Sequence, residues 1–158
     1  MNTSELGSSW LCARPHLRRL AAKLQGLLEL ADDMWQRGRA TGESVDYEAF
    51  EQTVAQKTAE VERAVHEATL SSLDIDAPFV RVWGKTYRRL HRTLRSYRTM
   101  AGSVPVTRTL YRALGTRSGA ALDPIAQRAG MVDGSWLPRT ARVMAHLWRQ
   151  RRLCFVLA

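Results

Sequence analysis

The chain has 158 residues, of which 45% are hydrophobic, and it carries a formal net charge of +9 at pH 7. This length suits one domain with a buried core, and no apolar run approaches the roughly 20 residues of a membrane-spanning helix. The N-terminus lacks a basic start followed by an apolar segment, so we expect no signal peptide, no membrane partner and a cytoplasmic location.

The charge is divided unevenly along the chain. Residues 1–78 hold 8 Lys+Arg and 13 Asp+Glu, net −5, whereas residues 79–158 hold 16 Lys+Arg and 2 Asp+Glu, net +14. Such asymmetry predicts an acidic part for packing or oligomerisation and a basic part for nucleic acid. Cys12 and Cys154 have no metal-ligand spacing, and we expect both to be reduced and structural.

The first predicted helix follows a polar start, residues 1–13, that we expect to be disordered. It begins with Pro15 in its first turn and ends at Gly38 and Gly42. Its apolar residues recur at steps of three and four, which places them on one face. They are Leu17, Leu20, Leu24, Leu27, Ala31 and Met34.

The second predicted helix runs from Asp46, a suitable N-cap, to about Leu73. Its apolar face comprises Tyr47, Phe50, Val54, Val61, Val65 and Ala68. Residues 14–76 therefore predict an acidic helical hairpin. We favour packing of its two helices on each other over a coiled coil with another chain, because the repeat is short.

Asp74 and Asp76 alternate with apolar residues after the second helix. Two carboxylates two residues apart offer fewer oxygen ligands than a hard cation needs. We therefore predict a solvated linker here and no metal site.

The segment 79–112 contains ten basic side chains and no acidic one, and His91 is charged only when protonated. The other nine repel one another, and a phosphate backbone would replace that repulsion with attraction. The segment predicts DNA binding, although a solvated basic face of an ordinary sheet is the alternative. The predicted DNA-binding residues are Arg81, Lys85, Arg88, Arg89, Arg92, Arg95, Arg98, Arg108 and Arg112.

The same segment is rich in strand-forming residues and alternates in character. One side of the predicted strand carries Thr93, Arg95, Tyr97 and Thr99, and the other carries mostly Leu90, Leu94 and Met100. Gly102-Ser103 is predicted to form a two-residue type II′ turn that pairs Ala101 with Val104. Pro105 would then face Met100 in a non-hydrogen-bonded pair, where its missing N–H removes no ladder bond.

Two further helices are predicted downstream. Asp123 caps a short helix from Pro124 through Arg128 that stops at Gly130, and a last helix begins near Pro138, with residues 153–158 as an off-pattern tail. The connection is long for a helix-turn-helix, so plain helix packing is favoured. Trp136 is expected to anchor the core.

The predicted fold class is α+β, with the N-terminal helical hairpin followed by a basic antiparallel β-hairpin or small sheet and short C-terminal helices over residues 77–152. The four histidines are scattered, and no phosphate-binding or dinucleotide-binding glycine motif occurs. We therefore expect no metal, no cofactor and no catalytic residue.

Five short motifs follow one another between residues 77 and 147. They are Gly84, Tyr87 and Arg88; Tyr97, Arg98, Thr99 and Gly102; Val104, Val106, Arg108 and Leu110-Tyr111-Arg112; Leu122-Asp123-Pro124; and Arg128-Ala129-Gly130. In this order they resemble the N-terminal region of bacterial insertion-sequence transposases of the ISKra group. The resemblance implies a DDE-type enzyme, in which three carboxylates hold two metal ions.

The residues that would supply those carboxylates do not follow here, because Asp123 and Asp133 are the only acids after residue 78. We therefore expect a non-catalytic, DNA-binding N-terminal fragment of a transposase, truncated before the catalytic domain. Its expected partners are DNA and either a second copy or a full-length transposase. The alternative is a helical protein-interaction or oligomerisation module that does not bind DNA.

Overall fold

A computed structural model describes residues 15–40, 44 and 46–156, with side-chain surroundings for 17–39, 44 and 46–148. The predicted disordered start, Gly42 and the surroundings of both cysteines lie outside these ranges. The chain divides into two compact units, Met1–Ala68 and Thr69–Ala158.

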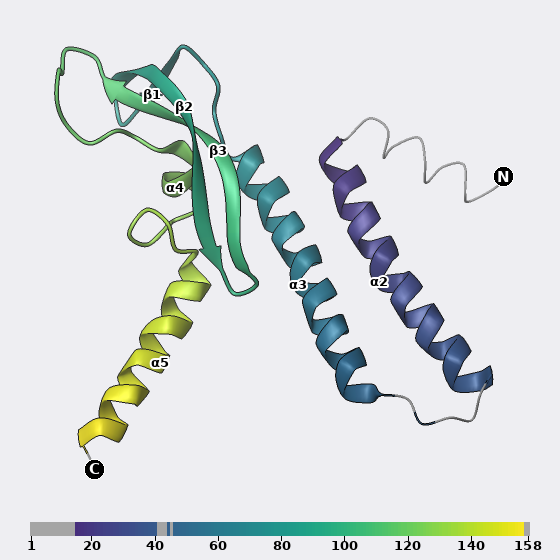
Figure 1. Ribbon diagram of the computed structural model, residues 1–158. Coiled ribbons are helices and arrows are strands. Elements are labelled where there is room, and N and C mark those ends of the chain that lie inside the picture. Colours follow the sequence, from purple (N-terminus) through teal and green to yellow (C-terminus); the bar gives the residue numbers. More distant parts are fainter. Residues whose placement is uncertain (1–14, 41–43, 45, 157–158) are drawn as a thin grey trace. The chain divides into compact units, whose positions relative to one another are not determined.

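The first unit contains two long helices, α2 (Pro15–Ala40) and most of α3 (Tyr47–Ser72) (Figure 1). Pro15 starts α2 as predicted, but Gly38 does not end it. An exposed helical glycine costs only about 1 kcal/mol relative to alanine, so the helix continues through it. Asp46 is the predicted N-cap of α3, and its Oδ1 accepts the N–H of Ala49 at 3.0 Å.

Two ion pairs join α2 to α3 and show that the helices run antiparallel. The Nζ of Lys23 lies 2.7 Å from the Oε2 of Glu60, and the Nη1 of Arg19 lies 3.4 Å from the Oε1 of Glu67. The lysine also lowers the pKa of Glu60, through its hydrogen bond and its charge. The predicted helical hairpin is confirmed.

The second unit is built on a three-stranded antiparallel sheet in the order β1-β2-β3. Its strands are β1 (Phe79–Val82), β2 (Lys85–Thr99) and β3 (Gly102–Ala113). Figure 1 shows β1 beside the end of the long β2–β3 hairpin that lies away from the hairpin's turn. A bulge interrupts the β2–β3 register at Leu90. The predicted α+β class is therefore confirmed.

The turn between β2 and β3 lies two residues earlier than predicted. Thr99 pairs with Gly102, so Met100 and Ala101 form the turn. Neither has a positive φ, whereas Gly102 has a φ of 114°. A turn of ordinary conformation followed by one glycine at positive φ connects the strands here, so the predicted type II′ turn at Gly102-Ser103 is wrong.

The shift in the turn changes the predicted partner of Pro105 but keeps Pro105 in a non-hydrogen-bonded pair. Pro105 lies opposite Ser96, not Met100. The N–H of Arg98 donates to the carbonyl of Ser135 at 2.8 Å, away from β3, so Arg98 belongs to a non-hydrogen-bonded β2–β3 pair. Because the two pair types alternate, Ser96 and Pro105 also form a non-hydrogen-bonded pair.

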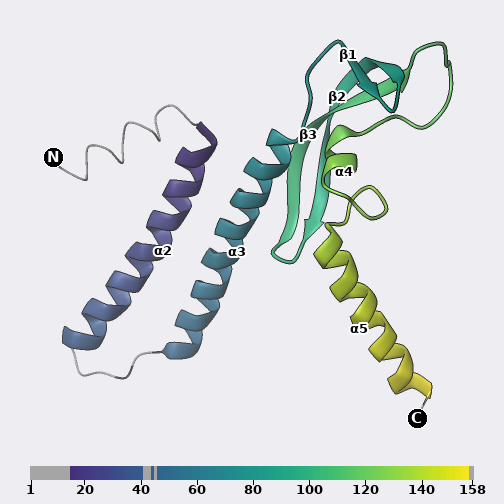
Figure 2. The same cartoon turned by 180° about the vertical axis from the view of Figure 1, so that it is seen from behind.

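The core of this unit lies on one face of the β2–β3 hairpin. Tyr97, Val104 and Val106 are buried there with Leu70 from the last turn of α3 and Ile125 from α4 (Pro124–Arg128). Figure 2 shows α4 against the hairpin from behind. Tyr97 and Thr99 share one side of β2, as predicted, and both are buried, whereas Arg95 on the same side is exposed.

Asp123 caps α4 as predicted, and its Oδ1 accepts the N–H groups of Ile125 and Ala126 at 3.0 and 3.2 Å. The last helix, α5 (Pro138–Val156), begins at the predicted proline and extends beyond residue 152. Between α4 and α5, Val132 and Trp136 close a short turn, and Trp136 bridges to β2. This strand-like connection and the five-residue α4 do not form a helix-turn-helix.

Candidate nucleic-acid interface

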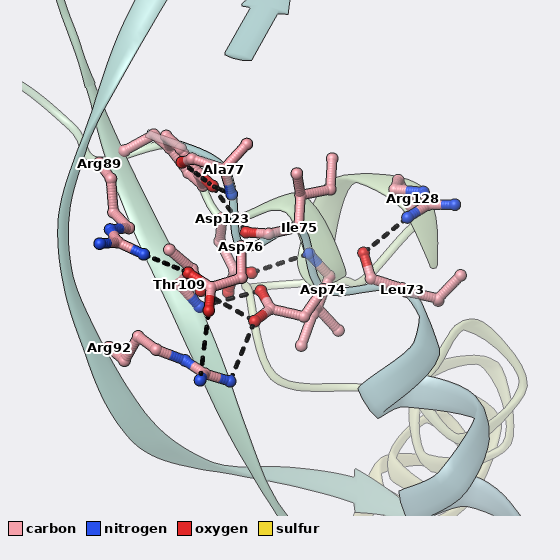
Figure 3. Close-up of polar contacts among 12 residues, drawn as sticks. Leu73, Asp74, Ile75, Asp76, Ala77, Arg89, Arg92, Thr109, Asp123 and Arg128 are labelled. Atoms are coloured by element: carbon pink, nitrogen blue, oxygen red, sulfur yellow. Dashed lines mark hydrogen bonds and ion pairs between the residues drawn. The ribbon is translucent and has the colours of Figure 1, made fainter. Parts of the chain in front are cut away.

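The segment after α3 brings two carboxylates to the basic strands (Figure 3). Asp74 is only 8% exposed, and its side chain accepts the N–H and the hydroxyl of Thr109 at 2.9 and 2.8 Å. Asp76 forms an ion pair with Arg89, and Arg92 lies 3.5 Å from Asp76 and 3.8 Å from Asp74. The predicted solvated linker is therefore wrong, because Asp74 satisfies the open edge of β3 and both aspartates neutralise β2.

The path of this segment is fixed by hydrogen bonds at both ends. The Nη1 of Arg128 donates to the carbonyl of Leu73 at 2.8 Å. The buried hydroxyl of Tyr111 lies 2.6 Å from the carbonyl oxygen of Ile75 and accepts the N–H of Ala77 at 3.1 Å. The two aspartates are thus held by backbone contacts as well as by their arginine partners.

A second carboxylate site joins β2, β3 and α4. Arg108 and Asp123 form an ion pair whose side chains are 16% and 10% exposed. The Oδ2 of Asp123 also accepts the Tyr97 hydroxyl at 3.2 Å. Burial, together with the nearby Asp123 charge, raises the pKa of Tyr97 to about 12. Asp123 therefore serves as a helix cap, an ion-pair partner and a core hydrogen-bond acceptor.

The nine predicted DNA-binding residues occupy four kinds of surroundings. Arg89, Arg92 and Arg108 face carboxylates, as described above. Arg98 lies over the ring of Trp136, with its guanidinium carbon 5.2 Å from the ring centroid. Arg112 is partly buried, and its Nη1 donates to the carbonyl of Arg117 at 3.3 Å. The remaining four are exposed, and none forms an ion pair within the described part of the chain: Arg81, Lys85, Arg88 and Arg95.

Several of these cations share one face of the sheet at the β1 end. Phe79 pairs with Arg88, which pairs with Arg112, so these three side chains form a row across the strands. Arg81 pairs with Thr86 on the same face. We call the exposed members of this face, Phe79, Arg81, Thr86 and Arg88, the β1 patch.

The row across the β1 patch places two like charges directly opposite each other. Residues paired across antiparallel strands have Cβ atoms about 5 Å apart, and opposed like charges destabilise a sheet. No acidic residue of the described chain forms an ion pair with Arg88 or Arg112. The β1 patch is therefore a site of uncompensated positive charge.

Two exposed aromatic residues accompany these cations, and the predicted site residues did not include them. Phe79 is 54% exposed in the patch, and Trp83 is 82% exposed in the turn between β1 and β2. Trp83-Gly84 occupies both central positions of a two-residue turn, with φ values of 48° and 76°. The sequence signal for this turn is Gly84 between two β-prone runs, because glycine accepts positive φ.

The described residues include no cluster of three or more His, Cys, Asp or Glu side chains that could hold a metal ion. None of the helices in these ranges combines the length and apolar character of a membrane span. The arrangement offers exposed cations and aromatic faces. No protein-family model, curated protein or solved structure matches the chain.

Proposed function

We propose that the chain binds DNA through the β1 patch, assisted by Lys85, Arg95 and Arg98. The observation that carries this proposal is the opposed pair Arg88 and Arg112, which has no carboxylate partner among the described residues. A bound phosphate would turn this repulsion into attraction and release condensed counterions.

The placement of Arg81 strengthens the proposal. Arg81 is a diagonal cross-strand neighbour of Arg88, and such neighbours lie about 7–8 Å apart. Arg81 and Arg88 can therefore reach one anionic backbone from a single face, with the partly buried Arg112 beside them. Phe79 lies beside Arg88 and offers a flat apolar surface to sugar or base, which favours nucleic acid over a simple polyanion.

The resemblance to insertion-sequence transposases suggests the biological setting. We propose that this chain is a DNA-binding N-terminal part of such a transposase, and that strand cleavage is carried out by carboxylates of another region or chain. The proposed family motifs have structural roles in the fold: Asp123 caps α4 and pairs with Arg108, whereas Arg88 belongs to the β1 patch.

The test is a titration of the chain with duplex DNA at several salt concentrations. If Arg81, Lys85, Arg88, Arg95 and Arg98 each contact a phosphate, the log–log slope of affinity against salt is about −4.5. Arg88→Gln is expected to weaken binding to all sequences and to reduce the slope by about 0.9.

Arg92→Gln is the matched control, because Arg92 already faces Asp74 and Asp76. It is expected to leave the slope unchanged. A wild-type slope near zero, or equal effects of the two substitutions, contradicts the proposal. Preference for an insertion-sequence end over a random duplex supports the transposase assignment, and equal affinities argue against it.

Exposed apolar side chains on α2 favour self-association as a second candidate function. Leu28 and Trp35 are 69% and 56% exposed. Sedimentation over a range of concentrations tests this function. A rise in mass with concentration, without any DNA binding, supports an interaction module instead of a DNA-binding protein.

A further inference from the structure

Trp83 lies at the tip of the β1–β2 hairpin in a conformation that tryptophan rarely adopts. Its φ is 48°, and the following Gly84 has a φ of 76°. Two-residue hairpin turns with two positive φ values favour Asn-Gly and Asp-Gly, because side chains with more bulk are strained there. The first turn position thus holds a residue that the local backbone disfavours.

The surroundings of Trp83 do not offset this strain. The residue is 82% exposed, so its ring gains little from burial. No aromatic or cation contact to the Trp83 ring occurs within the described ranges. A strained and exposed tryptophan points to a role in contacting a partner.

The neighbours of Trp83 indicate the chemistry of that partner. Arg81 and Lys85 lie within two residues of the turn, are exposed, and lack an ion pair among the residues that the structure describes. Phe79 is exposed at the other end of β1. Cations beside flat aromatic surfaces match a ligand with phosphates and bases, whereas an apolar protein surface would leave the cations unsatisfied.

We propose that Trp83 stacks on an unpaired base, so that the ligand of this hairpin is single-stranded or locally opened DNA. This inference rests on the proposed function, since the β1 patch would hold the backbone next to the stacked base. A tight turn presents the ring at a fixed position, which reduces the conformational entropy lost on binding. Bases inside an intact duplex are already stacked and offer no free face to the ring.

The test compares the wild-type chain with Trp83→Asn, because asparagine accepts positive φ and keeps the turn. Affinity for a labelled oligothymidylate of about 12 nucleotides is expected to fall at least about tenfold, the loss typical of one stacking side chain. Affinity for a blunt, fully paired duplex is expected to change less than about twofold, with an unaltered salt slope.

The same variant separates a binding role from a structural one. Relief of the strained turn is expected to raise Tm by about 2 °C while oligothymidylate binding weakens. Trp83→Phe, which keeps an aromatic face, is expected to retain most of the affinity. A lower Tm with parallel losses for both ligands would mean that Trp83 only supports the fold, and would overturn the inference.

Arg88→Gln distinguishes failure of this inference from failure of the proposed function. If Arg88→Gln weakens binding of both ligands while Trp83→Asn changes neither, DNA binding stands and base stacking is wrong. If the wild-type chain binds neither ligand at low salt, both proposals are overturned.

Discussion

Two groups of arginines on one basic sheet have different surroundings. Arg89 and Arg108 face Asp76 and Asp123, whereas Arg88 faces another arginine. Arg88 and Arg89 are adjacent in sequence, yet alternation along the strand sends their side chains to opposite faces. One run of positive charge therefore contains arginines that pair with carboxylates and arginines that do not, among the described residues.

The neutralised arginines depend on acids that lie outside the basic run. Asp76 precedes Arg89 by 13 positions and Asp123 follows Arg108 by 15. A count of charges within residues 79–112 omits both. Local absence of acids therefore overstates how many cations are available to a ligand.

The largest effect on stability is expected from removing the carboxylate of Asp123. Asp123→Ala leaves Arg108 without its carboxylate, removes the α4 cap and frees the Tyr97 hydroxyl, so we expect a loss of about 3–5 kcal/mol in the free energy of unfolding. Urea denaturation measures this loss. Asp123→Asn is the control and is expected to cost less, because its side-chain oxygen can still cap α4. A loss below about 1 kcal/mol in the alanine variant would mean that the Arg108–Asp123 ion pair does not stabilise the sheet.

An intermediate effect on stability is expected from raising the pH, because the Tyr97 hydroxyl donates to the same Asp123 carboxylate. The pKa of Tyr97 is raised to about 12, so above pH 10 the unfolded chain releases this proton while the folded chain retains it. Stability therefore falls as pH rises from about 10 to 12, by about 1.4 kcal/mol at pH 11. Urea denaturation at about pH 9, 10 and 11 measures the slope. Tyr97→Phe should lack this component, and an equal slope in both proteins would contradict the assignment.

The smallest effect is expected at Arg88, which has no ion pair among the described residues. Arg88→Gln removes the repulsion from Arg112, so we expect the free energy of unfolding to rise by about 0.5 kcal/mol at low salt. The gain should shrink as salt screens the charges. Arg89→Gln is the matched change on the neighbouring residue, and it should lower stability by up to about 1 kcal/mol. The contrast between Arg88 and Arg89 is contradicted if both substitutions change stability in the same direction.

Sequence reasoning predicted the local features well because they depend on neighbouring residues. Pro15 and Pro138 begin helices, and the carboxylates of Asp46 and Asp123 bond the first free N–H groups of the helices that they cap. The turn lies two residues earlier in the structure than the sequence predicted. Because this shift is even, side chains stay on the faces predicted for them. For this reason Tyr97 was placed correctly although its cross-strand partner was not.

The sequence by itself determined the α+β class, the helix starts and the concentration of positive charge after residue 78. Tertiary structure decided which of those charges remain available, because the path of residues 73–78 and the position of Asp123 depend on contacts far apart in the chain. It also decided that Phe79 would share a face with Arg88, since cross-strand register is set when distant segments pair. Periodicity and capping act over a few residues, whereas ion pairing and register require the assembled sheet.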